Sequence, residues 1–190
     1  MPSRRWVEFS ADWLEWSQRN LLAAVRATDA ANLHVRPGPR APSIAFHAWH
    51  MARWDDRYQS VLPSWCGNQV DESAEIWIAD DVVGRWGLAG VDTGDFGGTG
   101  AGLDDEASAA LPLPDATDLL AYMDATFGAF ERTVRGIDDD GTLDRVVVDL
   151  YGERSTIADA IADATSHSDR HLGMIEALRG VLGDRSTVTV

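Results

Sequence analysis

The segment STIADAIADATSHSDRHLGMIEALRGVLG, residues 155–183, decides the fold class and also carries the first sign of a functional site. Ser155 or Thr156 is suited to cap a helix, which we expect to run to about Leu182 before Gly183 ends it. Its apolar stripe consists of Ile157, Ile161, Ala164, Leu172 and Ile175. A long amphipathic helix of this kind needs other helices to cover its apolar face.

Two histidines, His167 and His171, border this stripe. Because they are four residues apart, their rings stack on one side of the helix, within reach of a single ion. A second pair, His47 and His50, lies in SIAFHAWHMARWDDRY, residues 43–58, so that four of the chain's five histidines fall in two helical segments. Two boundary histidines satisfied by local hydrogen bonds would be the simplest explanation for either pair alone.

Two more long helices and a short one are predicted. Ser10 is a candidate N-cap for a helix over residues 11–29, and Ser43 for one from about Ile44 to Leu62, ended by Pro63. A shorter helix is expected over residues 72–85.

A last long helix is predicted to begin at Asp115 or Thr117 and to cover residues 118–136. The preceding segment, residues 87–115, is rich in Gly and Asp and predicts a long ordered loop or lid. It is no phosphate loop, since GDFGGTGAG at 94–102 lacks the Gly-Lys-Ser/Thr ending. DRVVVDLYGERS, residues 144–155, is the one β-like stretch. The pattern therefore predicts an all-α protein, an antiparallel four-helix bundle with a long Gly-rich loop and at most a short strand pair, in a single domain over residues 1–190.

Charge and composition exclude several classes of protein. The formal net charge of −15 argues against nucleic acid and against anionic membrane surfaces as partners. A single cysteine, Cys66, fits a reducing compartment, and no signal peptide or run of about 20 apolar residues is visible, so we expect a cytoplasmic protein. Cys66 has no basic neighbour that would make it a nucleophile. The eight tryptophans favour a thick helical core or a walled cavity.

The histidines together suggest a metal site. Neutral imidazole is a good ligand for Zn, Ni, Fe or Cu. Three imidazoles from two helices leave a coordination position for water or substrate, as in catalytic sites, whereas four would close a tetrahedral one. Helical periodicity slightly favours His47 over His50 as the ligand from the earlier segment, without excluding His50.

The two histidine segments together resemble the DinB-like superfamily, in particular a branch with SIxWHxxHxARxED early and TVxDxLxxxxxHxxxHxGxIxxLRG late. GDFGGTGAGL (94–103) and PDATDLLAYMDA (114–125) fit the same pattern, so the resemblance covers nearly the whole chain. It implies a bundle of the DinB and YfiT kind, usually a homodimer, with a divalent metal such as Zn or Ni held by three histidines on two helices.

The resemblance also assigns positions. The family pattern His-hydrophobic-Ala-x-x-acidic aligns with HMARWD, residues 50–55, which implies His50 as the first ligand beside His167 and His171. His47 then lies next to the ligands or in the pocket wall. Met174 departs from the pattern, since many relatives have Gln or Glu there, and any polar role of that side chain is lost.

Family members with assigned activities include thiol S-transferases that use bacillithiol or mycothiol, and a mycothiol-dependent isomerase. The resemblance therefore implies a small-molecule substrate and a low-molecular-weight-thiol S-transferase, with a metal-assisted hydrolase as the variant; a non-catalytic metal- or ligand-binding stress-response module is the alternative. Asp55 and Asp163 are candidates to orient an imidazole, although solvated helix-face charge is the simpler role for both. Trp49, Met51 and Trp54 could lie either in the core or in the cavity wall. Arg53 and Arg57 either bind an anionic group of the substrate or pair with acids such as Asp56.

Overall fold

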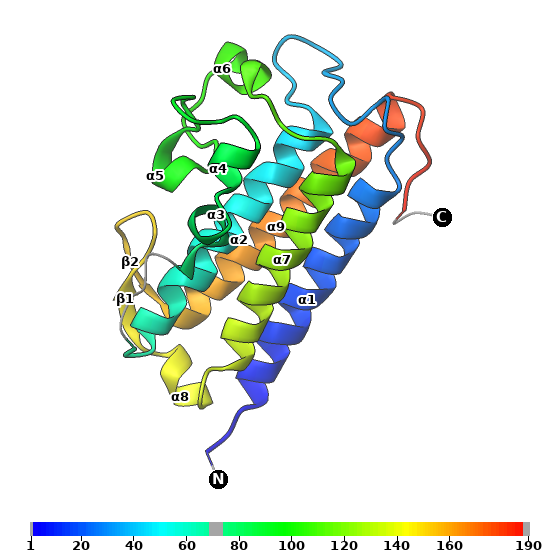
Figure 1. The fold of residues 1–190 in the computed structure, drawn as a ribbon. Coiled ribbons are helices and arrows are strands. Elements are labelled where there is room, and N and C mark those ends of the chain that lie inside the picture. The colour runs from blue at the N-terminus through cyan, green and yellow to red at the C-terminus, as the bar shows by residue number, and fades with distance from the viewer. Residues whose placement is uncertain (1, 69–73, 188–190) are drawn as a thin grey trace.

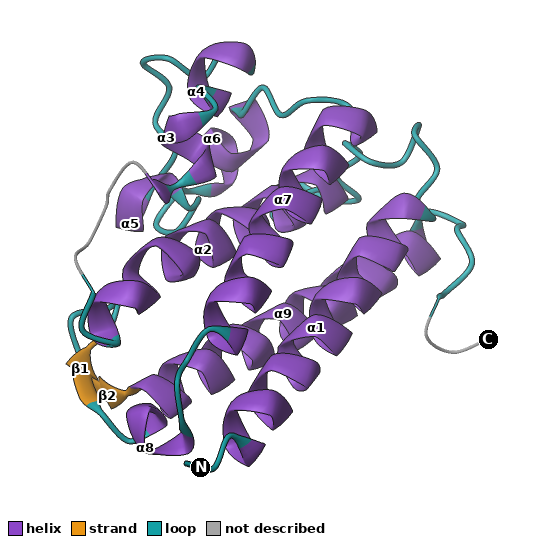
Figure 2. Cartoon of the chain, turned by 60° about the horizontal axis from the view of Figure 1, so that its bottom comes forward, coloured by secondary structure: helices purple, strands orange, loops and turns teal. Residues whose placement is uncertain are grey.

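Four long helices form the body of the molecule in the computed structural model, which describes residues 2–68 and 74–187 (Figure 1). They are α1 (Arg5–Arg26), α2 (Ile44–Trp65), α7 (Ala116–Arg135) and α9 (Ile157–Val181). Helices α1 and α9 run in one direction and α2 and α7 in the other (Figures 1 and 2). Each of α1 and α2 packs against both α7 and α9. Helices α2 and α9 are therefore neighbours, and because they run in opposite directions they are antiparallel. The predicted all-α bundle is confirmed.

Three of the predicted helix starts are present. Ser43 caps α2 by accepting a hydrogen bond from Phe46 N. Asp115, and not Thr117, caps α7. Thr156, and not Ser155, caps α9 in a capping box with Asp159. Each of these caps is local in sequence, which is why the sequence predicted them.

The start of α1 was predicted wrongly. Ser10 lies inside the helix, which begins five residues earlier, at Arg5. The free amides of the first turn, Trp6 N and Val7 N, donate to the carboxylate of Asp140 at 2.9 and 3.0 Å. A side chain far away in the sequence thus replaces the expected local cap.

Two further boundaries differ. Pro63 does not end α2, because it lies in the last turn and the helix continues to Trp65. The expected helix over residues 72–85 is two single turns, α3 (Ile76–Ala79) and α4 (Val82–Arg85), and residues 72 and 73 lie outside the described residues.

The remaining elements belong to the connections. The Gly-rich segment after α4 contains α5 (Asp95–Gly98) and α6 (Asp105–Ala110), and lies beside α2 and α7 as an ordered loop (Figure 1). The β-like stretch follows α8 (Asp140–Leu143) and forms an antiparallel pair, β1 (Val146–Val148) with β2 (Arg154–Thr156).

Apolar side chains fill the bundle in two clusters. Trp49, Trp77 and Trp86 belong to one, and Trp54 packs in the other with Phe130. Half of the tryptophans are therefore core residues, whereas Trp6, Trp13 and Trp16 are exposed along α1. Among the described helices there is none whose length and hydropathy would let it cross a bilayer.

Candidate metal centre

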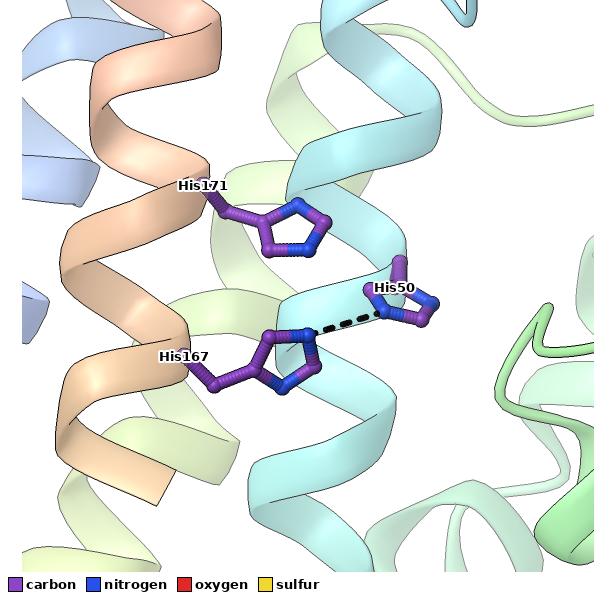
Figure 3. Close-up of side chains that lie close together, drawn as sticks. All are labelled: His50, His167 and His171. Atoms are coloured by element: carbon purple, nitrogen blue, oxygen red, sulfur yellow. Dashed lines mark hydrogen bonds between the residues drawn. The ribbon is translucent and has the colours of Figure 1, made fainter. Parts of the chain in front are cut away.

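Three histidines converge between α2 and α9: His50 from α2, and His167 and His171 from successive turns of α9 (Figure 3). Each offers one ring nitrogen, and the three nitrogens lie within 4.8 Å of one another. The Nε2 atoms of His50 and His167 are 3.4 Å apart. The spacing of four on α9 stacks its two rings, and the neighbouring antiparallel helix brings the third ring opposite them.

His50 is held by the Gly-rich loop. Its Nδ1 lies 2.6 Å from the carbonyl oxygen of Thr99. A carbonyl oxygen only accepts, so Nδ1 carries the proton and donates it. The lone pair of the neutral ring is then on Nε2, the nitrogen that faces His167. Metal-binding histidines are commonly oriented by such a bond from the other ring nitrogen to a backbone carbonyl.

His171 is oriented by the fourth histidine. Its Nδ1 is 2.9 Å from Nδ1 of His47, which leaves the Nε2 of His171 as its free nitrogen. His47 is thus next to the three converging rings but turned toward one of them. The family resemblance implied such a place for His47, next to the ligands or in the pocket wall, and the assignment of His50 as the ligand stays a prediction.

Burial keeps all four rings neutral. His50 and His171 are each 8% exposed. Burial lowers the pKa of His47, His50 and His167 to about 4. It lowers the pKa of His171 to about 2, with the three neighbouring imidazoles adding to the effect of burial. At neutral pH the nitrogens therefore offer lone pairs to a cation rather than protons.

Neither of the two predicted carboxylates, Asp55 and Asp163, forms a hydrogen bond with a histidine ring in the part of the chain that the structure describes. Asp55 is fully buried and accepts from Gln18 Nε2 at 2.6 Å. Burial raises the pKa of Asp55 to about 8, so at neutral pH it is mostly a neutral acid rather than a carboxylate that orients an imidazole. Asp163 is an exposed residue of α9, as its simpler role predicted.

Aromatic rings form the wall next to His50 and His167. Trp54 is 6.3 and 6.0 Å from these two imidazoles, measured between ring centroids. Phe96 from the Gly-rich loop and Tyr151 from the turn between the strands pack on Trp54 at 5.3 and 5.2 Å. Trp54 is therefore in the wall of the site, whereas Trp49 and Met51 are fully buried in the core.

A shallow apolar hollow of about 310 Å³ lies on the other side, beside His47. Its lining consists of Ala41, Pro42, His47, Met174, Ala177, Leu178 and Val181. Met174, the departure from the family pattern, contributes to this apolar lining.

The sequence did not identify Thr99, Phe96 or Tyr151. Thr99 acts through its main-chain oxygen, which no residue type reveals, and the two aromatic residues lie in loops whose path over the site depends on the folded chain. It also left Arg53 and Arg57 open. Both arginines pair with acids: Arg53 with Asp56 and Glu75, and Arg57 with Glu75.

Four long helices, with three imidazoles converging between two of them, define a class of helical proteins with a candidate tri-histidine metal centre. The chain belongs to the DinB superfamily, whose family model matches residues 14–175. A solved structure described as a conserved protein from Enterococcus faecalis has the same fold, with a TM-score of 0.71 over 97% of this chain and 99% of that one, at 16% identity. A comparison with curated proteins finds no match.

Proposed function

We propose that the protein is a metal-dependent enzyme in which His50, His167 and His171 hold one divalent cation, Zn or Ni. The observation that carries the proposal is the convergence of three neutral ring nitrogens within 4.8 Å. Neutral ligands leave the positive charge of a dication undiminished, and three of them leave a position open. A cation held there would lower the pKa of a bound water or thiol to near neutrality.

The proposed reaction is the transfer of a low-molecular-weight thiol, of the mycothiol or bacillithiol type, to a small electrophile. The apolar hollow beside His47 suits an uncharged part of such a substrate, and the aromatic wall around Trp54 restricts access of water. Metal-assisted hydrolysis is the variant, because the same open position serves a water as well as a thiol.

The deciding experiment is elemental analysis of protein purified from metal-replete cells. We expect about one metal per chain in the wild type and in His34→Ala, which alters the exposed fifth histidine, but loss of the metal in His167→Ala. Metal-free wild-type protein would overturn the proposal. Bound metal without turnover in a screen of thiols and electrophiles would favour a non-catalytic binding module.

We also propose that the protein is a cytoplasmic homodimer. The exposed aromatic residues of α1 form one row at helical spacing, Trp6, Phe9, Trp13 and Trp16. A groove of about 490 Å³ runs beside this row, between α1 and α9. Exposed apolar patches of this kind mark interaction sites. Analytical sedimentation tests the dimer. We expect the wild type to sediment as a dimer and Trp13→Glu as a monomer.

A further inference from the structure

Arg53 is a fully buried charged residue that the proposed chemistry does not use. It lies one turn after His50 on α2, and its side chain is fully buried. A guanidinium group has five N–H donors. All five have acceptors here, which are Gly98 O for Nε, Asp56 and the Tyr122 hydroxyl for Nη1, and Glu75 and Gly97 O for Nη2. The guanidinium therefore has no donor left for an anionic substrate.

Two of these five bonds reach the loop that holds His50. Arg53 donates to the carbonyls of Gly97 and Gly98 at 2.7 and 3.1 Å, and His50 donates to the next carbonyl, that of Thr99. Three consecutive carbonyls of the loop are thus bound by two side chains one turn apart on α2.

The loop needs this support, because its backbone conformation is an unfavourable one. Phe96 has a φ of 53°, in the left-handed region that non-glycine residues rarely adopt, and Gly97 and Gly98 follow with φ of 76° and 80°. Contacts that hold the two glycine carbonyls therefore hold the Thr99 carbonyl as well.

We propose that Arg53 is a positioning residue for the metal centre. By holding Gly97 and Gly98, it keeps the Thr99 carbonyl on Nδ1 of His50 and so presents the Nε2 lone pair of that ring to the cation. Its charge is balanced by Asp56 and Glu75, and its Cζ lies 4.6 Å from the ring centroid of Trp77. The inference deepens the proposed function, since it assumes that His50 is a ligand.

The first test compares Arg53→Lys with the wild type by chelator competition for Zn²⁺. Lysine keeps the charge, but its single nitrogen cannot reach two successive carbonyls and the acids as a planar fork does. We expect Zn²⁺ to bind 10- to 100-fold more weakly, the usual cost of losing such a supporting contact. The absorption spectrum of the Co²⁺-loaded variant should change as well. Unchanged affinity in a folded Arg53→Lys would overturn the proposal.

Two controls separate positioning from stability. Leu14→Ala removes a fully buried side chain of α1, so it lowers stability while the loop contacts remain, and its Zn²⁺ affinity should stay within threefold of the wild type. Gly98→Ala should displace the loop itself while leaving Arg53 in place. A Cβ at residue 98 would lie 2.5 Å from Thr93 Oγ1, and the φ of 80° there is unfavourable for alanine. It should weaken Zn²⁺ binding as Arg53→Lys does, and it keeps the test available should Arg53→Lys not fold. Full affinity in Gly98→Ala would contradict the proposal.

A readout without metal distinguishes this inference from the proposed function. Nitrogen NMR of the imidazoles in metal-free protein should show His50 protonated at Nδ1 in the wild type and a mixture of tautomers in Arg53→Lys and Gly98→Ala. If neither the wild type nor the variants bind metal but this difference is present, the proposed function fails and the role of Arg53 in positioning His50 stands. If the tautomer of His50 is the same in all three proteins, the positioning role fails.

Discussion

Two buried polar groups occupy neighbouring turns of α2, and their hydrogen bonding is opposite. Arg53 has an acceptor for each of its five donors. His50 has one nitrogen bound to Thr99, while its other nitrogen lies 3.4 Å from Nε2 of His167, which is at best a long hydrogen bond. Buried polar groups are normally satisfied, because each unmade bond costs about 1–3 kcal/mol. We therefore expect the satisfied group, Arg53, to stabilise the fold, and the weakly bonded group, the converging imidazoles of His50, His167 and His171, to bind a ligand.

The largest effect should come from removing one imidazole of the weakly bonded group, that of His171. His171→Leu is expected to weaken Zn²⁺ binding about 1,000-fold, or about 4 kcal/mol, since one of three ligands is lost. Chelator competition measures the affinity. The metal-free variant should unfold in urea within about 1 kcal/mol of the metal-free wild type, because a buried imidazole with an unpaired nitrogen contributes little to the fold. A large loss of stability would show that the two groups do not differ as described.

The matched change in the satisfied group is Arg53→Met. It removes one buried partner from each of Asp56, Glu75 and two loop carbonyls, which should lower the free energy of unfolding by about 3 kcal/mol. Urea denaturation of metal-free protein measures the loss. A variant as stable as the wild type would mean that the cluster is not a stabilising one.

The same contrast explains how much of the molecule the sequence could predict. Helix periodicity and local caps such as Ser43 and Thr156 identified the bundle, because those signals lie within a few residues of one another. The i,i+4 pair on α9 likewise indicated two candidate ligands. The choice of His50 over His47 needed the family resemblance, since both border the same apolar stripe.

What the sequence could not show depends on contacts between distant segments. Asp140 caps α1 although it lies 134 residues further along the chain, and Thr99 orients His50 through a main-chain atom. Asp55 was a reasonable partner for an imidazole until its burial beside Gln18 was known. Periodicity shows which face of a helix a residue lies on, but it does not show which group that residue's side chain will hydrogen-bond.

Acid should destabilise the metal-free protein through the histidines. Their pKa in the unfolded chain is about 6.5, whereas burial lowers it to about 4 for His50 and about 2 for His171. Between pH 6.5 and 4 the unfolded chain binds more protons, so stability is full above pH 6.5 and falls as the pH decreases. Asp55 acts in the opposite sense, since its pKa is raised to about 8.

The difference between the wild type and His171→Leu removes the contribution of Asp55, which both proteins share. We expect the wild type to lose about 2 kcal/mol more than the variant between pH 7 and pH 5, the loss calculated for one imidazole kept neutral. Urea unfolding at both pH values measures this. Parallel losses in the two proteins would show that His171 is solvated rather than buried.

The smallest expected effect concerns His47, a histidine that is hydrogen-bonded to one of the converging imidazoles but is not itself one of the three. Its Nδ1 meets Nδ1 of His171, so we assign it the orientation of a ligand and not ligation itself. His47→Leu should therefore weaken Zn²⁺ binding only about tenfold, or about 1.4 kcal/mol, and His47→Asn, which retains an acceptor, should recover most of that loss. A loss as large as that of His171→Leu would make His47 a ligand, as helical periodicity alone favoured. No loss in His47→Leu would leave His47 only the role of a wall of the apolar hollow.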